Sequence, residues 1–231
     1  LQASMVATTL KSPATLPSAP DHLSVLSYNV LLPNSSDGWW NYKMYDPRAP
    51  YDIDNVSTWD YRRDLIKNRI ELVNPDVVAL QEVSPASFEE DFAFMEKLGY
   101  DGVQMFKRGR FRPATFWRSC KCKIASPPVH KDRTLLTAFQ LELPEGHAHE
   151  NRIWHVLNCH LQAGPQGPRR VRQIDEGVNA SFKLAKKLKG ETLLFLSYFA
   201  RYHRYVCVSS LGLILVNSRC TFIPNHRGRS T

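Results

Sequence analysis

An apolar run that ends in a carboxylate, Asp76-Val-Val-Ala-Leu-Gln-Glu-Val83, most constrains how this chain can fold. It follows the turn-forming pair Asn74-Pro75, and an apolar run of this length after a turn is typical of a strand buried on both faces. Ligands of open α/β sheets bind at the carboxyl ends of strands, where Glu82 would stand. A carboxylate there needs a cation or a hydrogen-bond donor. The alternative is a capping or salt-bridge glutamate at the start of a loop.

Length and charge limit the class of protein. The 231 residues allow one large domain or two small ones, and a hydrophobic content of 43% indicates a globular protein. The formal charge of +8 favours an anionic partner, which is nucleic acid, a phosphorylated small molecule or a membrane surface. Five cysteines are an odd and sparse set, which favours a reducing compartment such as the cytoplasm or nucleus over a disulfide framework.

Composition divides the chain into three parts. Residues 1–21 are rich in Ala, Ser, Thr and Pro without a signal-peptide core, and we expect a flexible arm before a domain at 22–196. No Asp or Glu follows Glu191, and we expect 197–231 to be an unrelated basic and apolar tail that is poorly ordered. Its apolar part, 205–216, is shorter than the ~18 residues needed to span a bilayer, so no membrane partner is expected.

Periodicity predicts mixed strands and helices across residues 22–196. The expected strands are 22–32, 76–83, 100–107, 113–124, 134–143 and 152–161, with one more from Thr192. Helices are predicted at 59–73 and over a stripe that Ser87 and Glu90 would open as a capping box: Phe88, Phe92, Met95 and Leu98. A second apolar stripe predicts a long helix: Val171, Ile174, Val178, Phe182, Ala185 and Leu188.

Three predicted strands end in a polar residue: Leu26-Ser-Tyr-Asn-Val-Leu, Val78-Ala-Leu-Gln-Glu-Val and Val156-Leu-Asn-Cys-His-Leu. With Arg172-Gln173 early in the next helix, their order and spacing resemble the endonuclease/exonuclease/phosphatase superfamily, the deoxyribonuclease I-like fold. The segment from Arg112 to Arg118 is similar to one in the branch of poly(A)-specific deadenylases and plant calcium-binding members. The resemblance covers roughly residues 22–196. It implies an α/β sandwich of two packed sheets flanked by helices, incomplete at the C-terminus.

The resemblance also implies a metal-dependent hydrolytic site. Glu82 would bind Mg²⁺, with Mn²⁺ as the alternative, and the metal would polarise a phosphoryl oxygen. Asn29 would support Glu82, the metal or the attacking water, and His160 would donate a hydrogen bond to a phosphate oxygen. Three further residues are expected to bind substrate: Asn158, Arg112 and Arg172. Asn158 could instead be a structural amide, and His160 a core-edge histidine bonded to the backbone.

The last part of the chain departs from the family pattern. The family's next strand ends in Gly-Asp-Phe-Asn, whereas Tyr198-Phe-Ala-Arg follows Leu193–Ser197 here. The family's final Asp-His pair has no counterpart, because no carboxylate follows Glu191. A nucleophilic water needs a general base within hydrogen-bond reach, so we expect very low or no hydrolytic activity. Residues from about 197 onward would then be a replacement, as from intron read-through or a frameshift.

Two functions compete. The first is an Mg²⁺-dependent phosphodiesterase- or nuclease-type hydrolase scaffold, inactive when truncated, whose substrate is nucleic acid, RNA first, or a phosphorylated small molecule. The second is a non-catalytic module that binds nucleic acid or another partner through the basic stretches Lys107–Arg133 and Arg169–Lys189. Aromatic residues in the first stretch would stack on bases or, by strand alternation, point into the core: Phe106, Phe111, Phe116 and Trp117. A third reading is a gene product that fails to fold stably.

Overall fold

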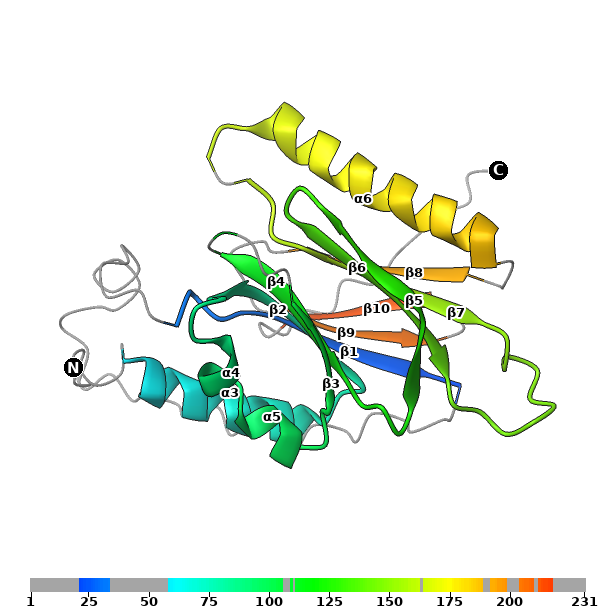
Figure 1. Ribbon diagram of the computed structural model, residues 1–231, viewed down its shortest axis with the longest axis horizontal. Coiled ribbons are helices and arrows are strands. Elements are labelled where there is room, and N and C mark those ends of the chain that lie inside the picture. Colours follow the sequence, from blue (N-terminus) through cyan, green and yellow to red (C-terminus); the bar gives the residue numbers. More distant parts are fainter. Residues whose placement is uncertain are drawn as a thin grey trace, which may run out of the picture.

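The apolar run after Asn74-Pro75 forms strand β2 (Val77–Val83), which lies inside the computed structural model (Figure 1). The side chains from Val77 to Leu80 are fully buried, because helices cover one face of the strand and a second sheet covers the other. The predicted strand buried on both faces is therefore confirmed. The structure describes residues 21–33, 58–105, 109, 111–162 and 164–188, with the backbone alone for 104–105, 192–198, 204–209 and 212–217.

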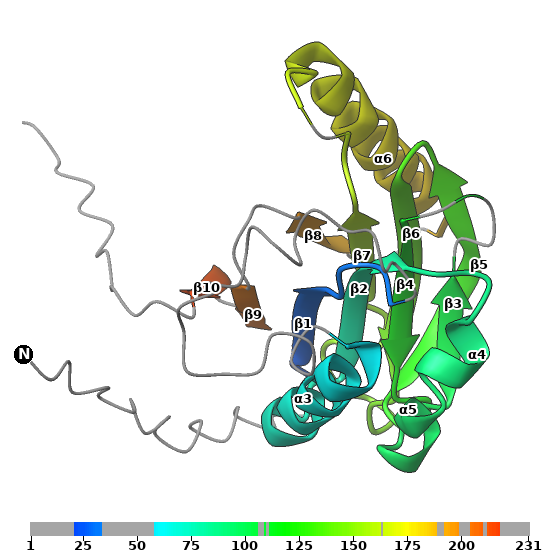
Figure 2. The ribbon, with the colours of Figure 1, turned by 90° about the vertical axis from the view of Figure 1, so that its left-hand side faces the viewer.

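The other strands are β1 (Leu23–Asn29), β3 (Gly102–Met105), β4 (Arg112–Trp117), β5 (Cys122–Lys131), β6 (Thr134–Leu141), β7 (Ile153–Cys159), β8 (Thr192–Tyr198), β9 (Arg204–Ser209) and β10 (Gly212–Asn217). They form a six-stranded sheet in the order β10-β9-β1-β2-β4-β3 and a four-stranded sheet in the order β5-β6-β7-β8. The two sheets pack face to face (Figure 2). β1 and β2 are parallel, as are β7 and β8, and the other paired strands are antiparallel.

Helices cover the outer face of each sheet. α3 (Trp59–Val73), α4 (Phe88–Asp91) and α5 (Phe94–Lys97) lie on the six-stranded sheet, and α6 (Gly167–Leu188) lies on the four-stranded sheet (Figures 1 and 2). α3 has the predicted bounds. The Thr58 hydroxyl accepts a hydrogen bond from the Tyr61 N–H at its start, and Asn74 ends it in the left-handed conformation. The α/β sandwich with flanking helices is thus confirmed.

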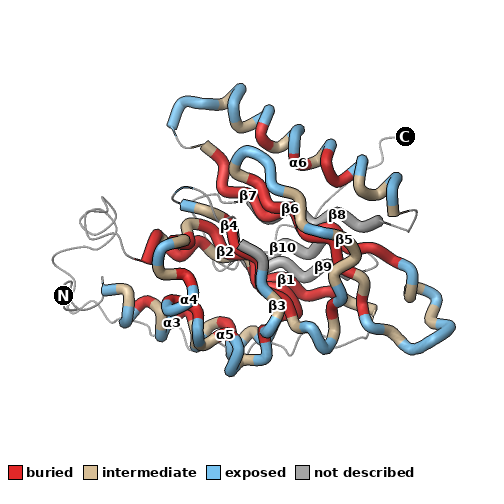
Figure 3. Tube along the Cα trace, viewed as in Figure 1, coloured by how far each residue is buried: buried red, intermediate tan, exposed pale blue. Residues whose placement is uncertain are grey.

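The core has two main apolar layers, seen as buried segments in Figure 3. One lies between the sheets, where Trp117 and Phe139 are in ring contact at 5.4 Å between centroids. The other lies between the six-stranded sheet and its helices, where Phe88 stacks on Phe116 at 5.6 Å. Successive residues of β2 alternate between these layers, so one continuous apolar run serves both.

The predicted strand 113–124 is wrong, because it is two strands in different sheets. The chain leaves β4 at Trp117 and turns, with the Cys122 N–H donating to the Arg118 carbonyl at 2.8 Å. Trp117 and Cys122 both face the inter-sheet layer, although they are five positions apart and one continuous strand would place them on opposite faces. The aromatic residues follow the core alternative in part: Phe116 and Trp117 are buried, Phe111 is 37% exposed, and Phe106 lies outside the described residues.

The predicted capping box at Ser87 and Glu90 is also wrong. The Ser87 hydroxyl donates to Asp91 Oδ2 at 2.6 Å and caps no backbone N–H. The predicted single helix is divided into α4 and α5. Its apolar stripe is nevertheless core, as expected, because every member is buried or packs against the core: Phe88, Phe92, Met95 and Leu98.

α6 confirms the predicted long helix, but its apolar stripe packs against the sheet only in part: Ile174 and Val178 contact the core. Val171 and Phe182 are each 60% exposed. The buried residues are Gln173, Gly177, Ala180 and Ser181. A Cβ atom at Gly177 would lie 2.9 Å from Leu157 Cδ2, so the helix backbone approaches β7 closely. Small residues decide the buried face because they permit this approach.

The C-terminal strands extend both sheets. β8 continues the four-stranded sheet beside β7, and β9 and β10 form an antiparallel hairpin on the free edge of β1. The boundary expected at residue 197 falls within β8, and the expected tail contains both hairpin strands. The division into arm, domain and tail stays a prediction, and residues 1–20 lie outside the described part. No helix in the described ranges is long and apolar enough to cross a membrane.

Candidate active site

The candidate site lies at the edge of the sandwich where β1 and β2 end. Their parallel register pairs Asn29 with Gln81, so Asn29 and Glu82 leave the two strands at the same edge. A β-bulge between Leu80 and Val83 interrupts the pairing of β2 with β4, and Glu82 has a φ of 61°. A bulge changes the direction of the side chains next to it. The Glu82 side chain at this bulge is 14% exposed.

Asn29 fixes the orientation of Glu82. Asn29 Nδ2 donates to Glu82 Oε1 at 2.8 Å. The side-chain oxygen of Asn29, Oδ1, accepts a hydrogen bond from the backbone N–H of Leu31, also at 2.8 Å. The side-chain amide can therefore present only its NH₂ group to the carboxylate. The backbone supports the same edge, because the Val30 and Leu32 N–H groups donate to the carbonyls of Gln81 and Glu82.

His160 reaches this carboxylate from the other sheet. It follows β7, and its Nε2 lies 3.2 Å from Glu82 Oε1. Its Nδ1 is 2.9 Å from the Phe111 carbonyl, and its backbone N–H donates to the Arg133 carbonyl at 2.9 Å. Because a carbonyl oxygen only accepts, Nδ1 carries a proton in this arrangement. The structure therefore brings Asn29, Glu82 and His160 together.

Backbone strain concentrates around this site. Of the six described non-glycine residues with positive φ, Asn74 ends α3 and the other five lie at this edge: Leu31, Leu32, Glu82, Phe111 and Arg133. Such residues cost of order 1–3 kcal/mol each and persist where the surroundings hold them, often at functional sites. Phe111 and Arg133 supply the two carbonyls that fix His160. The strain thus lies in the segments that position Glu82 and His160.

Asn158 lies between the sheets and away from the edge. Its Nδ2 donates to the carbonyls of Leu80 and Ala114, each at 2.9 Å, and its Oδ1 accepts from Gln81 Nε2 at 2.9 Å. The side chain is fully buried. These bonds connect β7 to β2 and β4, which favours the structural alternative for Asn158 over substrate binding.

Two guanidinium groups lie near Glu82. Arg112 begins β4, and Arg133 lies in the turn between β5 and β6. Burial, followed by the neighbouring Arg112, lowers the pKa of Arg133, whereas Asp132 and Glu82 raise it. The sequence analysis placed Arg133 only at the end of the basic stretch Lys107–Arg133 and did not assign it to this site; the available signal was the charged turn Lys131-Asp-Arg133 between two strands. A role for Arg112 in substrate binding stays a prediction.

In α6, the inward residue next to the site is Gln173, and Arg172 is exposed. Gln173 Nε2 donates to Asp132 Oδ2 at 2.8 Å, and its Oε1 accepts from the Gln162 N–H at 3.0 Å. The hydrogen bond from Gln173 is the main cause that lowers the pKa of Asp132. Gln173 therefore ties the loop after His160 to the turn that carries Arg133, a role that the sequence prediction did not assign.

A family model decides the classification. Residues 26–184 match the Endonuclease/Exonuclease/phosphatase family, and this range contains Asn29, Glu82 and His160. The chain belongs to this family. The resemblance stated from its motifs is confirmed.

Known relatives and solved structures agree with this family. The CCR4-Not complex 3'-5'-exoribonuclease subunit Ccr4 of Emericella nidulans is 34% identical over 98 residues, 42% of this chain and 13% of the relative. Human 2',5'-phosphodiesterase 12 is 31% identical over 106 residues, 45% of this chain and 17% of the relative. The structure of ANGEL2, a 2',3'-cyclic phosphatase, has a TM-score of 0.58 at 22% identity, over 76% of this chain and 52% of that chain. The aligned part of this family member thus spans under a quarter of these two curated relatives and about half of the solved structure.

β8 ends at the edge of the sandwich where His160 and Glu82 lie. β8 is parallel to β7, and Tyr198 pairs with Cys159, the residue before His160. The family's Gly-Asp-Phe-Asn block is expected at this strand end, where this chain has Ser197-Tyr-Phe-Ala200. The strand is present and its family carboxylate is absent from the sequence.

A divalent cation fits the donor set at Glu82. Asn29 and His160 both approach Oε1, and within the described residues no hydrogen bond reaches Oε2. Mg²⁺ is commonly held by one or two carboxylates, with water and substrate phosphates completing its shell. The described part contains no group of three or more His, Cys, Asp or Glu side chains able to hold a metal. Oε2 of this single carboxylate is therefore the atom at this edge that a divalent cation would contact.

Proposed function

We propose that this chain carries the metal-binding half of a phosphodiesterase- or nuclease-type hydrolase site that acts on nucleic acid, RNA in the first place. One observation carries the proposal. Glu82 stands on a strained bulge at a strand end, is bonded by Asn29, and faces His160 from the second sheet. Two polar residues from distant parts of the chain, Asn29 and His160, converge on one partly exposed carboxylate, an arrangement more typical of functional sites than of packing.

Each residue has a distinct proposed role. Glu82 would hold Mg²⁺, or Mn²⁺, which when bound supplies polarisation of a phosphoryl oxygen. Asn29 keeps the carboxylate in place through its NH₂ group. With both ring nitrogens protonated, His160 would keep its Nδ1–H on the Phe111 carbonyl, release Glu82 and donate from Nε2 to a phosphate oxygen. The cationic groups of Arg112 and Arg133 would attract the phosphate.

The proposed substrate is a phosphodiester of RNA, with a phosphorylated small molecule as the second choice. A net charge of +8 suits a polyanion. The relatives that support this choice are an exoribonuclease subunit and a 2',5'-phosphodiesterase. Turnover is expected to be very slow, because no carboxylate follows Glu191 to act as general base.

The test is cleavage of a labelled oligoadenylate by a large amount of enzyme, with Mg²⁺ or with EDTA. Slow Mg²⁺-dependent cleavage that Glu82→Gln abolishes would support the proposal. The matched control is Glu89→Gln, which removes an exposed carboxylate of α4 and should leave cleavage unchanged. Cleavage that persists in Glu82→Gln would contradict the proposed site.

A non-catalytic binding module is the second candidate. It is favoured by the basic residues of α6 that are exposed and lie outside the Glu82 site: Arg169, Arg172, Lys183, Lys186 and Lys187. This function predicts RNA binding that weakens steeply with salt, shows no turnover and is unaffected by Glu82→Gln.

A further inference from the structure

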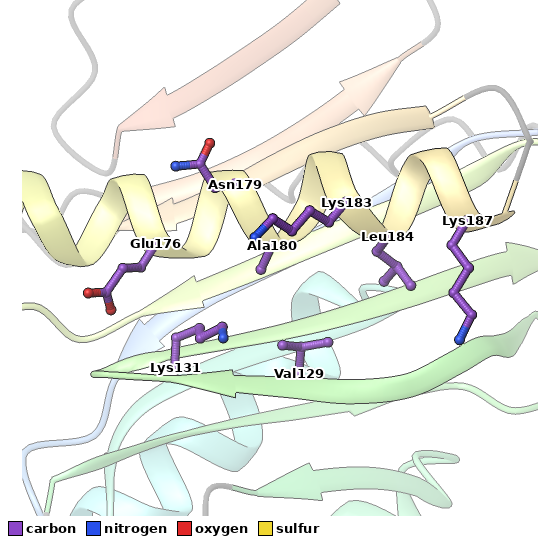
Figure 4. Close-up of a pocket in the computed structure, with 8 residues that line it drawn as sticks. All are labelled: Val129, Lys131, Glu176, Asn179, Ala180, Lys183, Leu184 and Lys187. Carbon is purple, nitrogen blue, oxygen red and sulfur yellow. The ribbon is translucent and has the colours of Figure 1, made fainter.

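A groove lies between α6 and the edge strand β5, on the outer face of the four-stranded sheet (Figure 4). Its volume of about 690 Å³ is within the range of ligand-binding sites. The floor is aliphatic and consists of Val129, Ala180 and Leu184. None of the residues assigned to the Glu82 site lines this groove, so it needs an explanation of its own.

Three lysines surround this aliphatic floor. Lys131 comes from β5, and Lys183 and Lys187 come from one side of α6 (Figure 4). Within the described residues none of the three forms an ion pair, and of the residues that line the groove only Glu176 is acidic. Three cations against one carboxylate leave an excess positive charge beside apolar surface. The complementary ligand is therefore both anionic and apolar.

The lining argues against two kinds of occupant. Single-stranded nucleic acid is bound by stacking its bases on aromatic side chains, and none of the described residues that line the groove is aromatic. An added β-strand would need donors along the edge of β5, but this strand contains Pro127-Pro128 and bulges on either side of Ser126. A helix satisfies its own backbone hydrogen bonds, so it needs neither aromatic side chains for stacking nor donors on the edge of β5.

We propose that this groove binds an acidic amphipathic helix of a protein partner. Its aliphatic side chains, spaced i, i+4, would contact Val129, Ala180 and Leu184, and its carboxylates would face Lys183 and Lys187. Glu176 repels carboxylates at the other end of the groove. The acidic residues of the helix therefore lie toward Lys187. This inference does not depend on hydrolytic activity at Glu82.

The test uses a fluorescein-labelled synthetic helix of about 16 residues, long enough to be helical, with leucines on one face flanked by glutamates. Fluorescence anisotropy should show saturable binding that is lost when the glutamates become glutamine or the leucines become alanine. The double variant Lys183→Glu with Lys187→Glu should bind at least about tenfold more weakly. The matched control, Lys97→Glu with Lys186→Glu, changes the same charge at exposed positions outside the groove and should bind as wild type.

Three results would overturn the proposal. The first is no saturable binding up to about 1 mM peptide. The second is an equal loss in both double variants, which would indicate general charge attraction. The third is that Lys183→Glu with Lys187→Glu weakens binding of a short single-stranded RNA and not of the peptide, which would make the groove a nucleic-acid surface. Thermal melts of each variant confirm that the exposed substitutions leave the fold intact.

Discussion

Asn29 Nδ2 lies 2.8 Å from Glu82 Oε1, although the two residues are 53 positions apart in the chain. The contact exists because β1 and β2 are parallel neighbours that end in register at one edge of the sheet. His160 approaches the same oxygen from the other sheet at 3.2 Å. One carboxylate oxygen is thus held from both layers of the sandwich, which leaves the other available for a cation.

Asn29→Asp should lower stability without metal and increase the stabilisation that a divalent cation gives. Without metal, two facing carboxylates repel, and we expect a loss of about 1–3 kcal/mol in the free energy of unfolding. With millimolar Mg²⁺ the added carboxylate should bind the ion, so the variant should gain more stability from metal than wild type does. Thermal denaturation with and without Mg²⁺ measures this, and exposed Asn68→Asp is the control. An equal metal response in both variants would count against the site.

Glu82 should tolerate glycine better than alanine. Its φ of 61° is in the left-handed region, where a Cβ is unfavourable and glycine is not. We therefore expect Glu82→Gly to be more stable than Glu82→Ala by about 1 kcal/mol in urea denaturation, the reverse of the usual order in a strand. Equal stability, or a more stable alanine variant, would mean that the bulge is not strained at this residue.

Asn158→Ala should destabilise the fold strongly. The substitution removes the side-chain hydrogen bonds to the carbonyls of Leu80 and Ala114 and one of the acceptors of Gln81 Nε2. We expect a loss of about 2–4 kcal/mol. Arg172→Ala, on the exposed side of α6, should change stability by less than about 0.5 kcal/mol. Chemical denaturation compares the two, and a mild effect of Asn158→Ala would contradict its role between the sheets.

Stability should fall as the pH drops below 6.5, in part because of His155. Burial lowers the pKa of this histidine, whose Nδ1 is 2.5 Å from the Ser181 hydroxyl. Below pH 6.5 the unfolded chain therefore binds more protons at this position than the folded chain, which favours unfolding by at most about 1.4 kcal/mol per pH unit. His155→Gln should flatten the profile between about pH 7 and 5. Burial also lowers the pKa of His130, so this residue should keep part of the slope. An unchanged pH profile in a variant that carries both His155→Gln and His130→Gln would contradict this assignment.

The sequence was sufficient for the parts of the fold that depend on local pattern. The run before Glu82 predicted a strand buried on both faces, because four consecutive apolar residues leave no polar face. The motif order predicted that Asn29, Glu82 and His160 end strands of a sandwich. It also offered Glu82 as one possible partner of Asn29, but it did not supply the partner of His160. The contact of His160 with Glu82 depends on how two sheets stack, and no spacing along the chain encodes that stacking.

Packing overrode local pattern elsewhere. The apolar stripe of α6 predicted the helix but not its buried residues, because Gly177 allows a close approach to Leu157 and leaves Val171 and Phe182 exposed. The turn after Trp117 was not predicted, although Trp117 and Cys122 face the same layer at an odd spacing that one continuous strand does not allow. The sequence analysis named Gln173 in a motif and Arg133 in a basic stretch but did not predict their roles at the site, since those roles depend on what the side chain or carbonyl contacts.

The most direct test of the central claim is a titration of the protein with Mn²⁺, followed by the loss of the free-ion electron paramagnetic resonance signal. Wild type should bind one Mn²⁺ at a saturable site that Mg²⁺ displaces. Glu82→Gln should lose this site, and Glu89→Gln should keep it. Equal Mn²⁺ binding by wild type and Glu82→Gln would contradict the account.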